Sequence, residues 1–137
     1  MIAVDTNVLA RFYCDDPSDP EARKQRPAAR RVMTEAAALF VPVTVILELE
    51  WVMRGFYELK PEQVCSVVEH LLGMPHVTVE RWEQVKDAVD LHRLGVDFAD
   101  ALHWVASKGC DSFATFDKAM DRAGTKLKLS PPVALAS

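Results

Sequence analysis

The chain has 137 residues, and half of them are hydrophobic, which is the size and composition of one ordinary domain with a core of its own. The net charge of −4 excludes binding to nucleic acid through an overall basic surface, so any such binding has to be local or metal-assisted. There is no apolar run of about 18 residues and no signal-like N-terminus, and the three cysteines form no C-x-x-C pair. These features predict a soluble cytoplasmic protein with reduced cysteines and no membrane segment.

Short apolar segments alternate with helical patterns along the chain. Strands are predicted at residues 2–4, 39–41, 77–79 and 112–115, with a fifth, edge strand at 127–129. Helices are predicted at 8–12, from 20 to about 38 with Asp19 as cap, after a cap at Thr44, at 61–73, at 81–94, from a cap at Asp97 to Gly109, and after Asp117. This alternation predicts an α/β fold in which helices cover both sides of a central parallel sheet of four to five strands. The domain is expected to span residues 1–130, followed by a loosely held tail at 131–137.

Four acidic residues interrupt or end apolar segments: Asp5, Glu48, Asp100 and Asp117. A carboxylate beside buried surface is costly unless a cation or hydrogen bonds offset its desolvation. Asp5 directly follows the first predicted strand and Asp117 comes two residues after the fourth, so both fall at the carboxyl edge of a parallel sheet, where such folds place their sites. We therefore predict one shared cation site. Because its ligands are all acids, Mg²⁺ or Mn²⁺ suits it better than zinc.

Each acid also has a simpler interpretation. Asp5 and Asp117 are suited to capping the helices that follow them, and Asp97 is expected to cap its helix or to support Asp100. In the helix after Thr44, Glu50 has Arg54 four residues on and is predicted to be a solvated structural residue. Glu48 has no such partner, which favours it as the ligand.

A row of arginines, Arg23, Arg26 and Arg30, follows i, i+3, i+7 spacing and so shares one helix face. Most such rows are solvated faces. The alternative is a patch that contacts phosphates beside an acidic site.

Three segments carry a family resemblance: DTNVLARF at the start, VILELEWV in the middle and DFADALHWVASKGCDSFATFD near the end. Together they resemble the PIN-domain family, and within it the VapC-type toxins of bacterial toxin–antitoxin pairs. The resemblance covers nearly the whole chain and implies a three-layer α/β/α domain with metal-dependent endoribonuclease activity. The acid quartet of the family falls on Asp5, Glu48, Asp100 and Asp117, and Asn7 and Thr115 match its supporting polar positions. It also implies a homodimer, a small cognate antitoxin, and transfer or ribosomal RNA as substrate.

Two other functions remain open from the sequence. A phosphatase with an N-terminal aspartate nucleophile would use Asp5, but such enzymes typically need a second acid two residues on, where this chain has Asn7. A non-catalytic PIN-like module for protein association would have no need for four mutually repelling charges. Metal-dependent assays on RNA and on a small phosphoester separate these functions.

Overall fold

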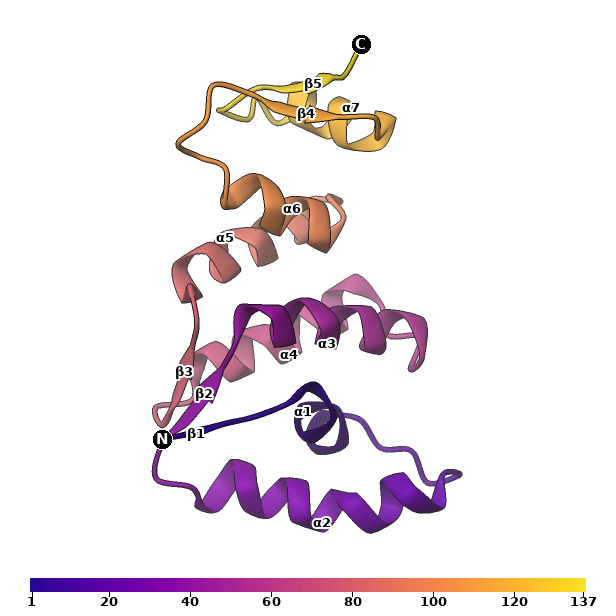
Figure 1. Cartoon of the computed structure of the whole chain (residues 1–137). Helices are drawn as coiled ribbons and strands as arrows, with labels where there is room; N and C mark the ends of the chain where they lie inside the picture. Colours follow the sequence, from indigo (N-terminus) through magenta and orange to yellow (C-terminus); the bar gives the residue numbers. More distant parts are fainter. The chain divides into compact units, whose positions relative to one another are not determined.

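The computed structural model describes residues 1–137. The chain divides into two compact units, Met1–Trp82 and Glu83–Ser137, and each is described by itself. Both are built from short parallel strands and the helices that connect them, so the predicted α/β class is confirmed (Figure 1). No helix of the chain has the length and apolar character needed to cross a membrane.

The first unit contains a three-stranded parallel sheet in the order β1 (Ile2–Ala3), β2 (Leu39–Val41), β3 (Val77–Val79). Its register pairs Ile2 with Leu39 and Leu39 with Val77. Parallel neighbours need long crossover connections. Helices α1 (Thr6–Tyr13) and α2 (Pro20–Glu35) connect β1 to β2, and α3 (Val43–Gly55) and α4 (Pro61–Gly73) connect β2 to β3. The three strands were predicted from their apolar runs, and the structure confirms them.

The core of the first unit follows from the spacing of apolar residues along its helices. Ile46, Leu49 and Met53 of α3 are completely buried, and they recur at i, i+3 and i+7. Val64, Val68 and Leu71 form the equivalent stripe on α4. Burial of these stripes fixes how α3 and α4 are rotated about their axes, and so fixes where the polar residues of each helix lie.

Helix starts agree with the sequence in one case and differ in another. Asp19 caps α2 by accepting a hydrogen bond from the Glu21 N–H at 3.0 Å, and Pro20 occupies the first helical position, as predicted. The prediction that Thr44 caps the next helix is wrong, because α3 already begins at Val43 after Pro42. Pro42 has no polar side chain, and the Glu80 carboxylate accepts from the Val43 N–H at 2.9 Å instead.

Helix α5 (Trp82–Arg93) starts at the last residue of the first unit, and its other residues belong to the second unit. The second unit also contains α6 (Phe98–Val105), β4 (Phe113–Thr115), α7 (Lys118–Lys126) and β5 (Val133–Leu135). Strands β4 and β5 pair in parallel, with Phe113 opposite Val133. The helix that was predicted to reach Gly109 ends at Val105, where Ala106 is its C-cap. Trp104 is buried, and its indole N–H donates to the Pro131 carbonyl at 2.9 Å.

The fifth strand was predicted at 127–129, and that prediction is wrong. Leu127 is the C-cap of α7, and Lys128 adopts a left-handed backbone with φ of 53°, which ends the helix. The Leu129 N–H then bonds to the Gly124 carbonyl at 3.0 Å, so these residues complete the helix end. The strand forms six residues later, inside the segment expected to be a loose tail. The five strands are therefore divided between a three-stranded and a two-stranded sheet.

Candidate active site

In the first unit, Asp5 lies at the end of β1 and caps α1. Its carboxylate accepts a hydrogen bond from the Thr6 N–H at 2.7 Å. This confirms the capping interpretation of Asp5. A cap uses only part of the acceptor capacity of a carboxylate, so it leaves lone pairs of this exposed residue for another partner.

Glu48 comes from α3, but its carboxylate reaches the start of α1. The Thr6 hydroxyl donates a hydrogen bond to the Glu48 side chain, and Thr6 itself is only 3% exposed. Asp5 and Glu48 therefore bond to the two donors of the same buried residue. The structure thus brings two of the four predicted acids together, and Thr6 links them.

Glu50 is also on α3, and its environment differs from the prediction. It forms the expected pair with Arg54, with 2.8 Å between Nε and the carboxylate, but it is only 1% exposed. The prediction that Glu50 is solvated is wrong because its position falls on the buried stripe of Ile46, Leu49 and Met53. Glu48 lies off that stripe and is exposed. Glu48 is therefore the exposed glutamate without a basic partner, and Glu50 is the buried one that pairs with Arg54.

Asn7 was predicted to support the acids. Its side chain is exposed and lines a hollow of about 230 Å³ between α1 and α2, together with Val8 and Ala28. The Asn7 side chain has no hydrogen bond to Asp5 or Glu48. Its supporting role therefore stays a prediction.

In the second unit, three aspartates interact around the start of α6. Asp97 is the N-cap of α6 and accepts from the Asp100 N–H at 3.1 Å, as predicted. Burial raises the pKa of Asp100, and the negative charges of Asp97 and Asp117 and a hydrogen bond with Asp117 raise it further, while His103 acts in the opposite direction. Asp100 and Asp117, which are 17 positions apart in the chain, therefore meet in the structure.

Thr115 and Asp117 are connected locally. The Thr115 hydroxyl accepts a hydrogen bond from the Asp117 N–H at 3.0 Å, and the Asp117 carboxylate caps α7 by accepting from Ala119 and Met120 at 2.8 and 3.1 Å. The Thr115 hydroxyl therefore holds the backbone of Asp117 and so fixes the position from which the Asp117 side chain extends.

The charges around these acids fit a hard divalent cation. None of Asp5, Glu48, Asp97, Asp100 and Asp117 takes part in an ion pair with lysine or arginine. The atoms that they could offer to a metal ion are carboxylate oxygens, which Mg²⁺ and Mn²⁺ prefer as ligands. Burial and the negative charges of Asp97 and Asp117 raise the pKa of Asp100, and a cation beside it would act in the opposite direction. The side chains as they stand do not form any group of three or more that would hold an ion, so metal binding remains a proposal.

The predicted arginines all lie on α2, in the first unit. Arg23 and Arg30 are exposed, and Arg26 is partly buried and pairs with Asp15 at 2.6 Å. The structure confirms that the three share one face, because together they line a single hollow.

Comparison with known proteins agrees with this fold. The model of the PIN-domain family matches residues 2–126, and the chain belongs to this family. It is similar to a VapC ribonuclease from Aquifex aeolicus (strain VF5), with 28% identity over 130 residues that cover 92% of this chain and 94% of the relative. No solved structure gives a significant match. The resemblance to the PIN-domain family and to its VapC type, inferred from the three sequence segments, is thereby confirmed.

Proposed function

We propose that this protein is a metal-dependent endoribonuclease that hydrolyses RNA phosphodiester bonds. The observation that carries the proposal is the cluster of Asp97, Asp100 and Asp117, which are joined by hydrogen bonds and have no ion pair with lysine or arginine, in a chain of the PIN-domain family. The similar protein from Aquifex aeolicus is named as a ribonuclease, which supports RNA as the substrate.

In this proposal Asp5, Glu48, Asp100 and Asp117 are the residues that hold Mg²⁺ or Mn²⁺. Such an ion supplies a water of lowered pKa as the nucleophile and neutralises charge on the reacting phosphate. The protein has to supply the positions of the carboxylates. Thr6 orients Glu48, the α1 cap orients Asp5, and Thr115 and the α7 cap orient Asp117. Asp100 lies beside the negative charges of Asp97 and Asp117, and a nearby cation would offset this repulsion.

The test is cleavage of a labelled RNA by the purified chain with Mg²⁺ or Mn²⁺, compared with Asp5→Asn, Glu48→Gln, Asp100→Asn and Asp117→Asn variants. Each substitution removes one ligand charge with little change in shape, so we expect activity to fall on the order of a hundredfold or more. Chelation of the metal should abolish cleavage, and its return should restore it.

Asp111→Asn and Glu35→Gln are the matched controls, since both residues are exposed acids outside the cluster, and both variants should cleave normally. Wild-type cleavage by all four acid variants would contradict the assignment. Hydrolysis of a small phosphoester without cleavage of RNA would identify a phosphatase, and failure to act on either substrate would favour a non-catalytic module.

We further propose that the protein is the toxin of a type II toxin–antitoxin pair. It would cleave transfer or ribosomal RNA, form a homodimer and be held inactive by a small antitoxin. The similarity to a VapC protein over 92% of the chain supports this role. Expression of the chain alone should arrest growth, and co-expression of the protein encoded beside it should relieve the arrest. The Asp100→Asn variant should be harmless. Growth that is unaffected by the active wild-type protein would exclude the toxin role while leaving the nuclease chemistry intact.

A further inference from the structure

Helix α2 carries an arginine-lined hollow that the acid site does not use. Asp15, Arg23, Arg26, Pro27 and Arg30 surround a space of about 410 Å³ on the surface of the first unit. The three arginines are spaced at i, i+3 and i+7, so the row covers two turns of the helix, about 10 Å. A row of this length is long enough to contact more than one phosphate of a strand.

The charges in the hollow favour an anion. Three guanidinium groups face one carboxylate there, so the lining has an excess of two positive charges. The side chains of Arg23 and Arg30 are exposed and have no hydrogen bond or ion pair within the protein. Arginine has five donors in a planar fork that matches phosphate oxygens, so these two residues have their whole binding capacity available.

Arg26 is held differently from its two neighbours. It pairs with Asp15 at 2.6 Å, and its side chain is 24% exposed, whereas that of Asp15 is 68% exposed. The buried Nε of Arg26 has no hydrogen-bond partner, so the pair does not satisfy all donors of this guanidinium. The pair of Arg26 and Asp15 holds these two lining residues together, whereas the side chains of Arg23 and Arg30 have no partner within the protein.

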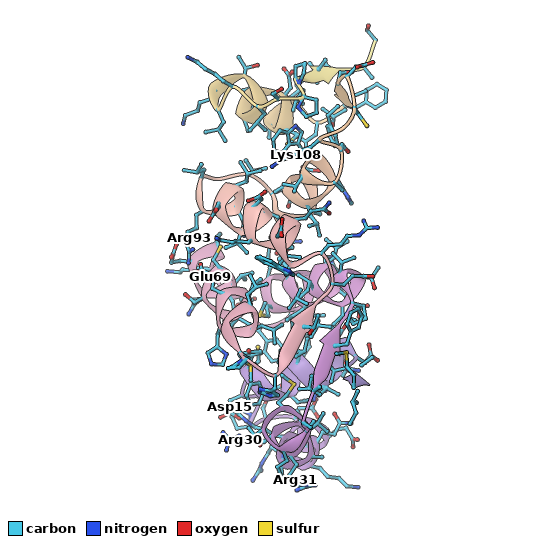
Figure 2. The ribbon with its side chains drawn as sticks, turned by 90° about the vertical axis from the view of Figure 1, so that its left-hand side faces the viewer. Asp15, Arg30, Arg31, Glu69, Arg93 and Lys108 are labelled. Carbon is cyan, nitrogen blue, oxygen red and sulfur yellow. The ribbon has the colours of Figure 1, made fainter.

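Figure 2 shows that Arg30 extends toward the side where Asp15 lies, whereas Arg31 points away from it. Lys24 and Arg31 are exposed cations of the same helix that do not line the hollow. Lys24 and Arg31 therefore serve as controls for Arg23 and Arg30, because they have the same charge on the same helix but lie outside the hollow.

We infer that this hollow is a phosphate-binding surface for single-stranded RNA, with Arg23 and Arg30 as the contacting residues and Arg26 as the positioning residue. The inference rests on the proposed ribonuclease function for the identity of the ligand. Contacts of this kind position the strand and do not read its sequence, so they would raise affinity for many RNAs alike.

The experiment measures binding of a short fluorescein-labelled single-stranded RNA of mixed sequence to the full chain carrying Asp100→Asn, which prevents cleavage. In that background, Arg23→Gln/Arg30→Gln is compared with Lys24→Gln/Arg31→Gln. Both double variants remove two positive charges from α2 and leave the pair of Arg26 with Asp15 in place. Affinity is measured by fluorescence anisotropy over a series of salt concentrations.

The Arg23→Gln/Arg30→Gln variant should weaken binding on the order of tenfold and lower the slope of log affinity against log salt by about 1.4, which corresponds to two lost phosphate contacts on a single strand. The Lys24→Gln/Arg31→Gln variant should change affinity less than about twofold and keep the slope. A merely structural role of Arg23 and Arg30 would not change the salt slope.

Equal affinities and slopes for the two double variants would overturn the inference, even if the acid variants confirm the nuclease. Loss of RNA binding in the arginine variant would support the inference even if the chain cleaved no RNA, so the two proposals fail separately. Binding of poly-glutamate at the same arginines, with no binding of RNA, would assign the hollow to an acidic protein partner and would also overturn it.

Discussion

At the scale of single residues, a hydrogen bond from Thr6 determines how Glu48 is placed. The four acids stand out in the sequence, because a carboxylate that interrupts an apolar run is unusual and its position in a strand–helix pattern can be read directly. That they share one metal site stays a prediction. The contact between Thr6 and Glu48 was not predictable, since it joins residues 42 positions apart and leaves no local pattern. The burial of Glu50 was missed for a related reason. Its pairing with Arg54 can be read from the sequence, but the sequence does not show that the side of α3 carrying Glu50 faces the core.

Replacing Thr6 tests this placement. Thr6→Val keeps the shape of the side chain and removes the hydroxyl that donates to Glu48. We expect RNA cleavage and Mn²⁺ affinity to fall about 10- to 100-fold, because groups that orient a metal ligand have effects of this size. The free energy of unfolding should fall by no more than about 1.5 kcal/mol, the net value of one hydrogen bond.

Thr6→Ser is the control for that substitution, because it retains the hydroxyl and should recover most of the cleavage and the Mn²⁺ affinity. Thr6 is a positioning residue in this account, so a Thr6→Val protein with wild-type Mn²⁺ affinity and cleavage rate would show that the hydroxyl has no such role.

At the scale of elements, the contact between α7 and β5 depends on one glycine. Gly124 lies in α7 and is buried, and a Cβ built there would come within 2.7 Å of the Val133 Cβ and Cγ2 atoms of β5. Only a residue without a side chain lets this strand approach the helix so closely. Caps and proline positions were readable from the sequence, as at Asp19 and Pro20. The place of β5 was not, because it depends on this approach of two segments and not on the pattern of either.

Gly124→Ala should therefore destabilise the protein. Overpacking costs about 1–3 kcal/mol, and the higher helix propensity of alanine offsets only about 1 kcal/mol of that. The free energy of unfolding, measured by chemical denaturation, should fall in Gly124→Ala. Gly55→Ala in α3 is the matched control, because a Cβ there meets nothing within 4 Å. Equal stability of Gly124→Ala and the wild type would show that β5 does not pack on α7 in this way.

At the scale of the whole molecule, the family match runs through both units, from residue 2 to residue 126. Asp5 and Glu48 lie in the first unit, and Asp100 and Asp117 lie in the second. A central sheet of four to five strands was expected, whereas the largest sheet has three strands and β4 and β5 pair separately. Strand order follows from which segments pair across the chain, and the local apolar patterns that identified four of the strands do not specify it.

The account depends on the four acids acting as one set, and titration of Mn²⁺ into the purified chain by calorimetry tests this most directly. Glu48→Gln changes the first unit and Asp100→Asn the second, so the two variants and their combination form a double-mutant cycle. Residues that share an interaction give non-additive effects, whereas independent ones add. We predict that each single variant weakens Mn²⁺ binding at least about tenfold and that the double variant loses much less than the sum of the two free energies. Unchanged Mn²⁺ affinity in either single variant, or strictly additive losses, would contradict a shared metal site.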